Sequence, residues 1–531
     1  MAPFMTSLKK IAVNAHPCFP PTEQLLVEGG DARIALNREN LNRYGCSPLP
    51  DPEVVALGSS TASGISVAGF AAADRLRTRL VQAAQTASDA VIYAHELKRI
   101  RQEFIRLCGV SDLHGLDVVF AASGTDLHLI AAQLGGAAET PMLAIMVDPA
   151  ETGSGVPAAL AGRHFSSRAA LGDAVIEDEP ILGNGAANND GIDVATVAIR
   201  LADGTPRPIA DIDAEFAAAV IQAAQMGQRV LLVLTDVSKT GIIAPSPACA
   251  LALRQKLPHA VDVLVDACQF RIAPSTLHAY LELGFMVALT GSKFVTGPPF
   301  SGALLIPAAA ASRLRGQPLP RALSAYSTRA DWPESWDASA LPDNVANFGL
   351  LLRWEAALEE LRAFRSVPEA AVANFLQEFA RAILKRLAAD PLFEPLPVPA
   401  LDRSSLGGAT GWDHIQTIFP FLLFHPATHA GRVPLKREET TQAYRLLQID
   451  LSDRFEDDAV AALRCQLGQP VACGNRGGVP VSALRLCAGA RLVVEATAQG
   501  GRNAPAVIEK ALAALDKTAL LVRSGWNKAG R

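Results

Sequence analysis

The chain has 531 residues, is 50% hydrophobic and carries a formal net charge of −5. This length predicts two domains and a large buried core. The charge provides neither the basic surface typical of nucleic-acid binding nor a polybasic membrane patch, so a small-molecule enzyme is favoured.

The N-terminal residues and the cysteines indicate a cytoplasmic protein. Residues 11–21 combine an Asn, a His and three prolines instead of the apolar core of a signal peptide. No apolar run reaches the roughly 18 residues that a membrane-spanning helix needs. The eight cysteines have no paired spacing, so neither a disulfide framework nor a zinc site is expected.

The first half of the chain predicts an α/β domain. Residues 1–64 are rich in turns and form an N-terminal arm, and residues 65–107 have apolar positions at helical spacing, which predicts two helices. Strands and helices then alternate from Asp117 to about Pro307, the pattern of a mostly parallel sheet flanked by helices. Residues 173–208 interrupt this pattern and are interpreted as a surface insertion or β-ribbon. We assign residues 65–316 to this large domain.

The second half predicts a smaller α+β domain. Residues 317–343 form a linker, and residues 344–364 and 368–387 predict two long helices. Strands are expected near Thr417–Phe424 and Ser482–Cys487. The small domain therefore covers residues 344–531.

A strand ending at Ala122 runs into Ser123-Gly124-Thr125 and then a helix from Leu127 to Leu134. Such a turn leaves backbone N–H groups free at a helix N-terminus, where the helix dipole favours an anion. We interpret it as a phosphate-binding turn. The alternative is a plain helix N-cap.

Two later strands end in an acid and in a lysine. Residues 261–266 end at Asp266, and residues 287–290 lead to Lys293 one helix-sized interval further on. Because parallel strands deliver their carboxyl ends to the same sheet edge, the two side chains are expected to be neighbours. Pyridoxal phosphate (PLP) requires this pair: an amine that binds it covalently and a carboxylate that keeps its pyridine nitrogen protonated.

In this order and at these intervals, the three segments resemble the fold-type I PLP-dependent enzymes, within them the class V aminotransferase and cysteine desulfurase branch. The resemblance covers about residues 65–310. It implies a fold-type I PLP-dependent transferase fold and a homodimer in which the loop Gly297–Gly302 reaches the partner's phosphate.

The motifs assign roles by resemblance. Asp266-Ala-Cys-Gln269 resembles the branch's Asp-x-x-Gln, which makes Asp266 the pyridinium partner and Gln269 a donor to the ring oxygen. Thr290-Gly-Ser292-Lys293 resembles Ser-Gly-His-Lys, with Lys293 as the Schiff-base lysine. The residues implied in cofactor binding are Gly124, Thr125, Thr152, Asp266, Gln269, Thr290, Ser292 and Lys293.

Two departures from the family pattern leave alternatives open. The family's ring-stacking His or aromatic is missing after the strand 142–147, so Glu151 or Thr152 could lie over the ring, with His164 more distant. The family's Asn after the strand 230–234 is also missing. Asp236 or Ser238 could replace it.

An amino-acid substrate brings an α-carboxylate, which a planar guanidinium binds bidentately. Arg485 lies on an apolar predicted strand, where an arginine requires an anion. It also resembles the family's substrate-facing arginine and is our candidate. The weaker candidates are Arg464, Arg491, Arg329 and Arg271.

The predicted function is a PLP-dependent transferase that acts on a small amino acid through an external aldimine, with Lys293 as proton shuttle. The alternative is a carbon–sulfur or carbon–carbon lyase, for which a mobile thiol among Cys465, Cys473 and Cys487 could carry a persulfide. No metal is expected. A dinucleotide-binding domain is disfavoured because its triple-glycine turn is missing, and a non-catalytic protein of the same fold is disfavoured by Lys293 itself.

Overall fold

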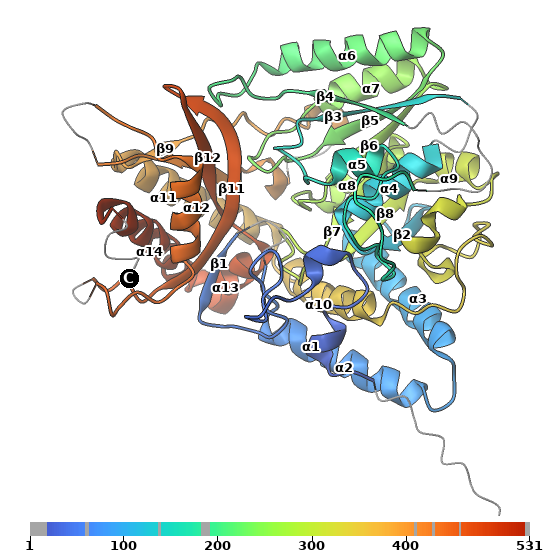
Figure 1. Cartoon of the computed structure of the whole chain (residues 1–531), viewed down its shortest axis with the longest axis horizontal. Coiled ribbons are helices and arrows are strands. Elements are labelled where there is room, and N and C mark those ends of the chain that lie inside the picture. The colour runs from blue at the N-terminus through green and yellow to red at the C-terminus, as the bar shows by residue number, and fades with distance from the viewer. Residues whose placement is uncertain are drawn as a thin grey trace, which may run out of the picture.

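The computed structural model describes residues 19–58, 63–135, 140–181, 192–407, 411–426, 431–455 and 458–525. Figure 1 shows two β-sheets, each packed against helices, with the curved ribbon of the C-terminal strands on the left and the larger sheet on the right. The expectation about the N-terminal opening concerns residues up to 21, of which residues 1–18 lie outside the described residues.

The larger sheet has seven strands in the order β2-β8-β7-β6-β5-β3-β4. Neighbouring strands are parallel except where β8 pairs antiparallel with β2 and with β7. The prediction of a mostly parallel α/β sheet is therefore confirmed. The strands are β2 (Asp117–Ala121), β3 (Met142–Val147), β4 (Asp193–Val197), β5 (Arg229–Thr235), β6 (Val261–Asp266), β7 (Met286–Thr290) and β8 (Gly302–Ile306).

Helices cover both faces of this sheet, which explains why its central strands are apolar without alternation. In β5, Val230 and Leu232 pack in one core cluster with Phe216, whereas Leu231 and Val233 pack in a second cluster with Leu127. The helices of this region are α4 (Gly124–Gly135), α5 (Val156–Leu160), α6 (Ile209–Gln225), α7 (Pro247–Lys256), α8 (Pro274–Glu282) and α9 (Ala308–Leu314).

The smaller sheet has five strands in the order β1-β11-β12-β10-β9. The two strands expected in the C-terminal region are present as β10 and β12. The strands are β1 (Val54–Leu57), β9 (Phe393–Pro395), β10 (Ile418–Leu423), β11 (Arg464–Arg476) and β12 (Val479–Cys487). The helices around them are α11 (Glu369–Ala389), α12 (Arg437–Leu446), α13 (Ala490–Gly501) and α14 (Ala504–Arg523).

The remaining helices connect the two regions. They are α1 (Thr22–Leu25), α2 (Val67–Ala83), α3 (Asp89–Cys108) and α10 (Phe348–Arg365). Helix α10 packs against α2, α3 and α13, so it belongs to both regions, and β1 of the N-terminal arm pairs in parallel with β11. The domain boundaries stay a prediction.

Within residues 173–208, the structure differs from the expected surface insertion. Residues 193–197 form β4, the edge strand of the large sheet, parallel to β3. The glycine- and asparagine-rich residues 182–191 lie outside the described residues. Among the described helices, none combines the length and apolarity needed to cross a bilayer.

Candidate active site

A pocket lies at the carboxyl ends of the central strands, and residues of β11 and β12 of the smaller sheet also line it. It brings together residues from segments more than 450 positions apart in the chain, from Arg33 to Arg485. Of the predicted site residues, those that line it are Gly124, Thr125, Asp266, Gln269, Thr290, Ser292, Lys293 and Arg485. Thr152 is buried nearby but does not line the pocket.

Asp266 ends β6 inside this pocket. One carboxylate oxygen accepts a hydrogen bond of 3.1 Å from the backbone N–H of Cys268, and the other lies 3.4 Å from Nε2 of His128. Burial alone would raise the pKa of Asp266, but the charges of His128 and Lys293 outweigh burial and hold the pKa below its ordinary range. Asp266 is therefore ionised at neutral pH and can keep a bound cation protonated.

His128 on α4 was not predicted from the sequence. Its Nδ1 lies 2.7 Å from the backbone oxygen of Gly124, and because a carbonyl only accepts, Nδ1 must carry a proton. Nε2 must carry a second proton if the imidazole is to attract the Asp266 carboxylate electrostatically. Burial lowers the pKa of His128, but Asp266 and the hydrogen bond to Gly124 together raise it by more. A histidine one turn after Ser-Gly-Thr is the signal that could have revealed it.

We expect His128→Gln to destabilise the protein more at about pH 6 than at about pH 9. Because the pKa of His128 is raised on folding, its contact with Asp266 stabilises the fold below about pH 6.5, and this contribution disappears as pH rises through the raised value. Thermal unfolding of both proteins, freed of bound small molecules, measures the difference. A gap that stays constant or widens with pH would contradict the ion pair.

The turn before α4 has the features of an anion site. A Cβ on Gly124 would come within 2.9 Å of Cys268 Sγ, so the glycine lets the backbone approach the neighbouring strand end closely. Arg33, from the N-terminal arm, donates to Ser123 Oγ and Thr125 Oγ1, each at 3.3 Å, and forms an ion pair with Asp31. Arg33 was not predicted from the sequence, and it adds a cation to the helix N-terminus.

Thr290 and Ser292 follow β7 at the same edge of the pocket. The Thr290 hydroxyl donates to the backbone oxygen of Cys268 at 2.6 Å, and its role in cofactor binding stays a prediction. Ser292 and Lys293 are the next two lining residues of this segment. The Ser123 hydroxyl likewise donates to Asp126, so the predicted donors for a phosphate that stay free of these bonds are Ser292 and the backbone N–H groups after Ser123.

The acids considered for ring contacts are engaged elsewhere. Glu151 forms a buried ion pair with Arg200 at 2.9 Å, and its carboxylate also accepts from Ser238 Oγ at 2.8 Å. Asp236 pairs with Arg403 and accepts from Tyr280. The three residues considered for contacts with the cofactor ring, Glu151, Asp236 and Ser238, do not line the pocket.

His164 contacts the Tyr326 hydroxyl through Nδ1 at 2.6 Å and also lies outside the pocket lining. The residues that line the pocket in place of these candidates are Gly153 and Ser154, after β3, and Lys239, after β5. Lys239 was not singled out from the sequence. Nothing in its local pattern distinguishes it from an exposed lysine.

Arg485 on β12 is 1% exposed and lines the pocket. Its guanidinium donates to the backbone oxygens of Gln469, at 2.8 Å, and of Lys239, at 3.2 Å. No carboxylate of the described residues forms an ion pair with it. Two alternative candidates are already paired, Arg464 with Asp51 and Arg491 with Glu360.

The other two arginine candidates lie outside the pocket lining. Arg271 is buried and donates to Thr417 and to the backbone oxygen of Ala488, and Arg329 begins a short 3-10 helix in the connecting segment. Cys465, Cys473 and Cys487 are buried, and burial raises the pKa of Cys465 to about 12 and that of Cys473 to about 11. This favours inert thiols.

Neither a family model nor a curated protein matches this chain. Solved structures of similar chain path include SPT with a PLP internal aldimine, at 14% identity over 88% of both chains with a TM-score of 0.46. Others are the cysteine desulfurase CsdA from Escherichia coli (15% identity, 88% of this chain and 95% of that chain, TM-score 0.48) and mouse CSAD (16%, 90% and 85%, 0.48). At these identities none of them specifies a reaction for this chain.

Proposed function

We propose that this protein is a PLP-dependent transferase acting on a small amino acid. The observation that carries the proposal is the pocket itself, in which a lysine, an acid that is ionised at neutral pH, an anion-binding turn and an arginine without a carboxylate partner among the described residues face one space. Each corresponds to one part of the cofactor–substrate pair: aldehyde, ring nitrogen, phosphate and α-carboxylate.

The residues divide the work as follows. The backbone N–H groups after Ser123, together with Arg33 and Ser292, would hold the phosphate, and Gln269 would donate to the ring oxygen. Asp266 would hold the proton on the ring nitrogen, and His128 keeps the Asp266 carboxylate ionised. The bound cofactor supplies an electron sink for the bond that breaks at the substrate Cα.

Lys293 has two tasks in this proposal. Its Nζ holds the cofactor covalently in the resting enzyme, and it moves the proton at the substrate Cα during turnover. Arg485 binds the α-carboxylate and so orients the Cα bonds relative to the ring. A transferase would move a group between the amino acid and an acceptor, whereas a lyase would release a fragment of the amino acid, and mass spectrometry of the products separates the two.

We expect the PLP-loaded protein to absorb visible light and to carry the cofactor on Lys293 after borohydride reduction. Lys293→Ala abolishes this label because it removes the only amine proposed to bind the aldehyde. Lys239→Met is the matched control, since it removes the other lysine of the pocket and should leave the label in place. Peptide mapping decides the assignment, and a label on Lys239 in the unmodified protein would overturn it.

We also propose a homodimer, which the family resemblance implies, and a cytoplasmic location, which the cysteines favour. In the dimer the loop 297–302 would contribute to the partner's site. Light scattering should give twice the chain mass of 55.9 kDa. A fully active species with the mass of one chain would contradict the dimer.

A further inference from the structure

Lys239 brings an additional cation into the pocket. It lies in the turn that follows β5, and its side chain lines the same space as Lys293 and Arg485. Nζ donates to the backbone oxygen of Ala150 at 3.1 Å, which leaves two of the three ammonium N–H donors for other partners. No carboxylate of the described residues forms an ion pair with it.

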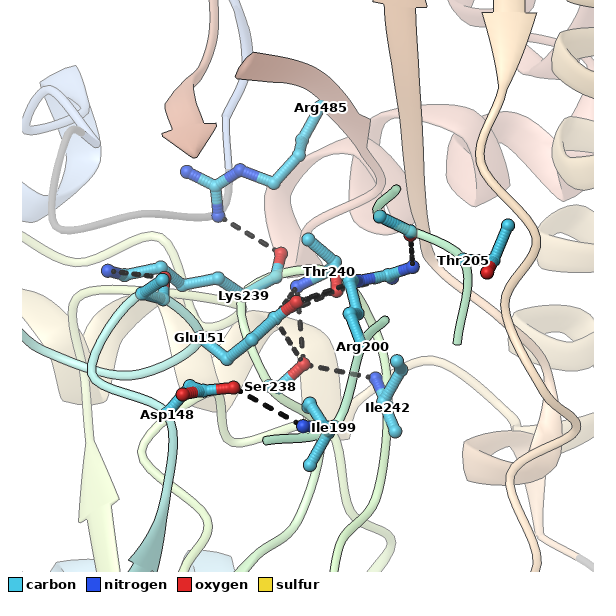
Figure 2. A network of polar contacts seen from close by, with 12 residues as sticks. Asp148, Glu151, Ile199, Arg200, Thr205, Ser238, Lys239, Thr240, Ile242 and Arg485 are labelled. Carbon is cyan, nitrogen blue, oxygen red and sulfur yellow. Dashed lines mark hydrogen bonds and ion pairs between the residues drawn. The ribbon is translucent and has the colours of Figure 1, made fainter. Parts of the chain in front are cut away.

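The position of Lys239 is fixed by a buried polar network, which Figure 2 shows. The Glu151 carboxylate accepts from Ser238 Oγ and from the backbone and side chain of Thr240, on either side of Lys239. The backbone N–H of Lys239 donates to the Glu151 carbonyl at 2.8 Å. The turn is thus bonded at three successive residues, which fixes the backbone from which the Lys239 side chain enters the pocket.

The same turn also holds Arg485. The carbonyl of Lys239 accepts from Nη1 of Arg485 at 3.2 Å, as Figure 2 shows from the arginine side. The backbone carbonyl of Lys239 thus links the two residues, and both side chains line the same pocket. A single small ligand with two acidic groups can contact both.

The charges of the pocket are not balanced. Arg33 is paired with Asp31, and Asp266 faces His128. Three cations remain, Lys239, Lys293 and Arg485. Burial is the largest cause that lowers the pKa of Lys239, to about 8, and repulsion by the charges of Arg485 and Lys293 lowers it further. An anion beside Lys239 would relieve this repulsion.

We propose that Lys239 forms a second anion subsite, and that the substrate is an amino acid with an acidic group on its side chain. The inference rests on the proposed function, because Lys293 must be occupied by the cofactor and Arg485 by the α-carboxylate before Lys239 is the cation left over. Carboxylate, sulfinate and phosphate side chains share the required chemistry.

Amine-free acids test the subsite without any reaction at Lys293. Calorimetric titration of the PLP-loaded protein compares succinate with butyrate and glutarate with valerate, pairs of equal carbon number that differ in one carboxylate. We expect the diacid of at least one pair to bind about tenfold more tightly, as one additional charge-assisted contact implies.

Variants assign the preference to its residue. Lys239→Met should bind diacid and monoacid equally, and Lys239→Arg should keep the preference because it keeps the charge. Arg485→Leu should weaken binding of both acids, since it removes the carboxylate site that they share. Lys239→Gln replaces Lys239→Met if the latter does not fold, as judged by circular dichroism.

The outcomes separate the two proposals. Equal binding of diacid and monoacid by the unmodified protein, or an undiminished preference in Lys239→Met, would overturn the second subsite while Lys293 still carries the cofactor label. Absence of the label from Lys293 counts against the proposed function instead. Sulfinate- and phosphate-bearing amino acids, compared with neutral analogues of equal length in the same titration, then identify the preferred acidic group.

Discussion

Asp266→Asn is expected to slow the reaction of the PLP-loaded enzyme with its amino-acid substrate by roughly 100-fold or more, the scale of losing one preorganised electrostatic partner. The carboxylate is ionised because His128 and Lys293 hold its pKa below the ordinary range. A neutral amide in the same place cannot keep the ring nitrogen protonated, so the cofactor loses its capacity to accept electrons.

The measurement is stopped-flow absorbance after mixing the holoenzyme with amino acids. Cofactor content should remain near one per chain in Asp266→Asn, because the phosphate turn and Lys293 are unchanged. Asp262→Asn serves as a matched control, since Asp262 lies on the same strand but pairs with Arg229 and Arg313 outside the pocket. Near-native rates in Asp266→Asn would show that this acid does not contact the ring.

Glu151→Gln is expected to lower the free energy of unfolding by about 3–5 kcal/mol, the effect of breaking a buried ion pair from one side. The side chains of Glu151 and Arg200 are 4% and 7% exposed, so Arg200 would be left charged without its partner in a site with little water. Figure 2 shows that the same carboxylate also holds the turn 238–241. Loss of diacid binding should therefore accompany the loss of stability.

Urea unfolding measures the change in the free energy of unfolding, and Glu334→Gln is the matched control with an exposed ion pair. Glu334 pairs with Lys98 at 3.2 Å, but the two side chains are 90% and 62% exposed, so its loss should change the unfolding free energy by at most about 1 kcal/mol. The double variant Glu151→Gln/Arg200→Met should recover part of the stability because it removes the orphaned charge. Equal effects of Glu151→Gln and Glu334→Gln would contradict the role assigned to the network.

The fold and the strand ends were accessible from the sequence because they depend on local patterns. Short apolar runs that end in polar residues predicted β6 and β7, and parallel pairing of these strands brings their carboxyl ends to one edge. Asp266 and Lys293 follow those ends and both line the pocket. The turn Ser123–Thr125 was found in the same way, from a strand that stops where a helix begins.

The local patterns failed where a side chain could pair with a distant partner. Glu151, Asp236 and Ser238 occupy suitable places in the chain for ring contacts, but each is engaged by other residues. Which acid pairs with which arginine depends on contacts such as that between Asp236 and Arg403, 167 positions apart. A sequence without alignment holds no record of such pairing.

The sequence by itself determined the α/β class, the succession of strands and helices, and the pairing of an acid with a lysine at one sheet edge, because strand periodicity and strand ends are local properties. Only the tertiary structure decided which charges surround that pair. Arg33 comes from the arm, Lys239 from a turn held by Glu151, and Arg485 from the other sheet. These three residues come together only because distant segments pack against one another. Burial then shifts their pKa values and strengthens the electrostatic interactions between them.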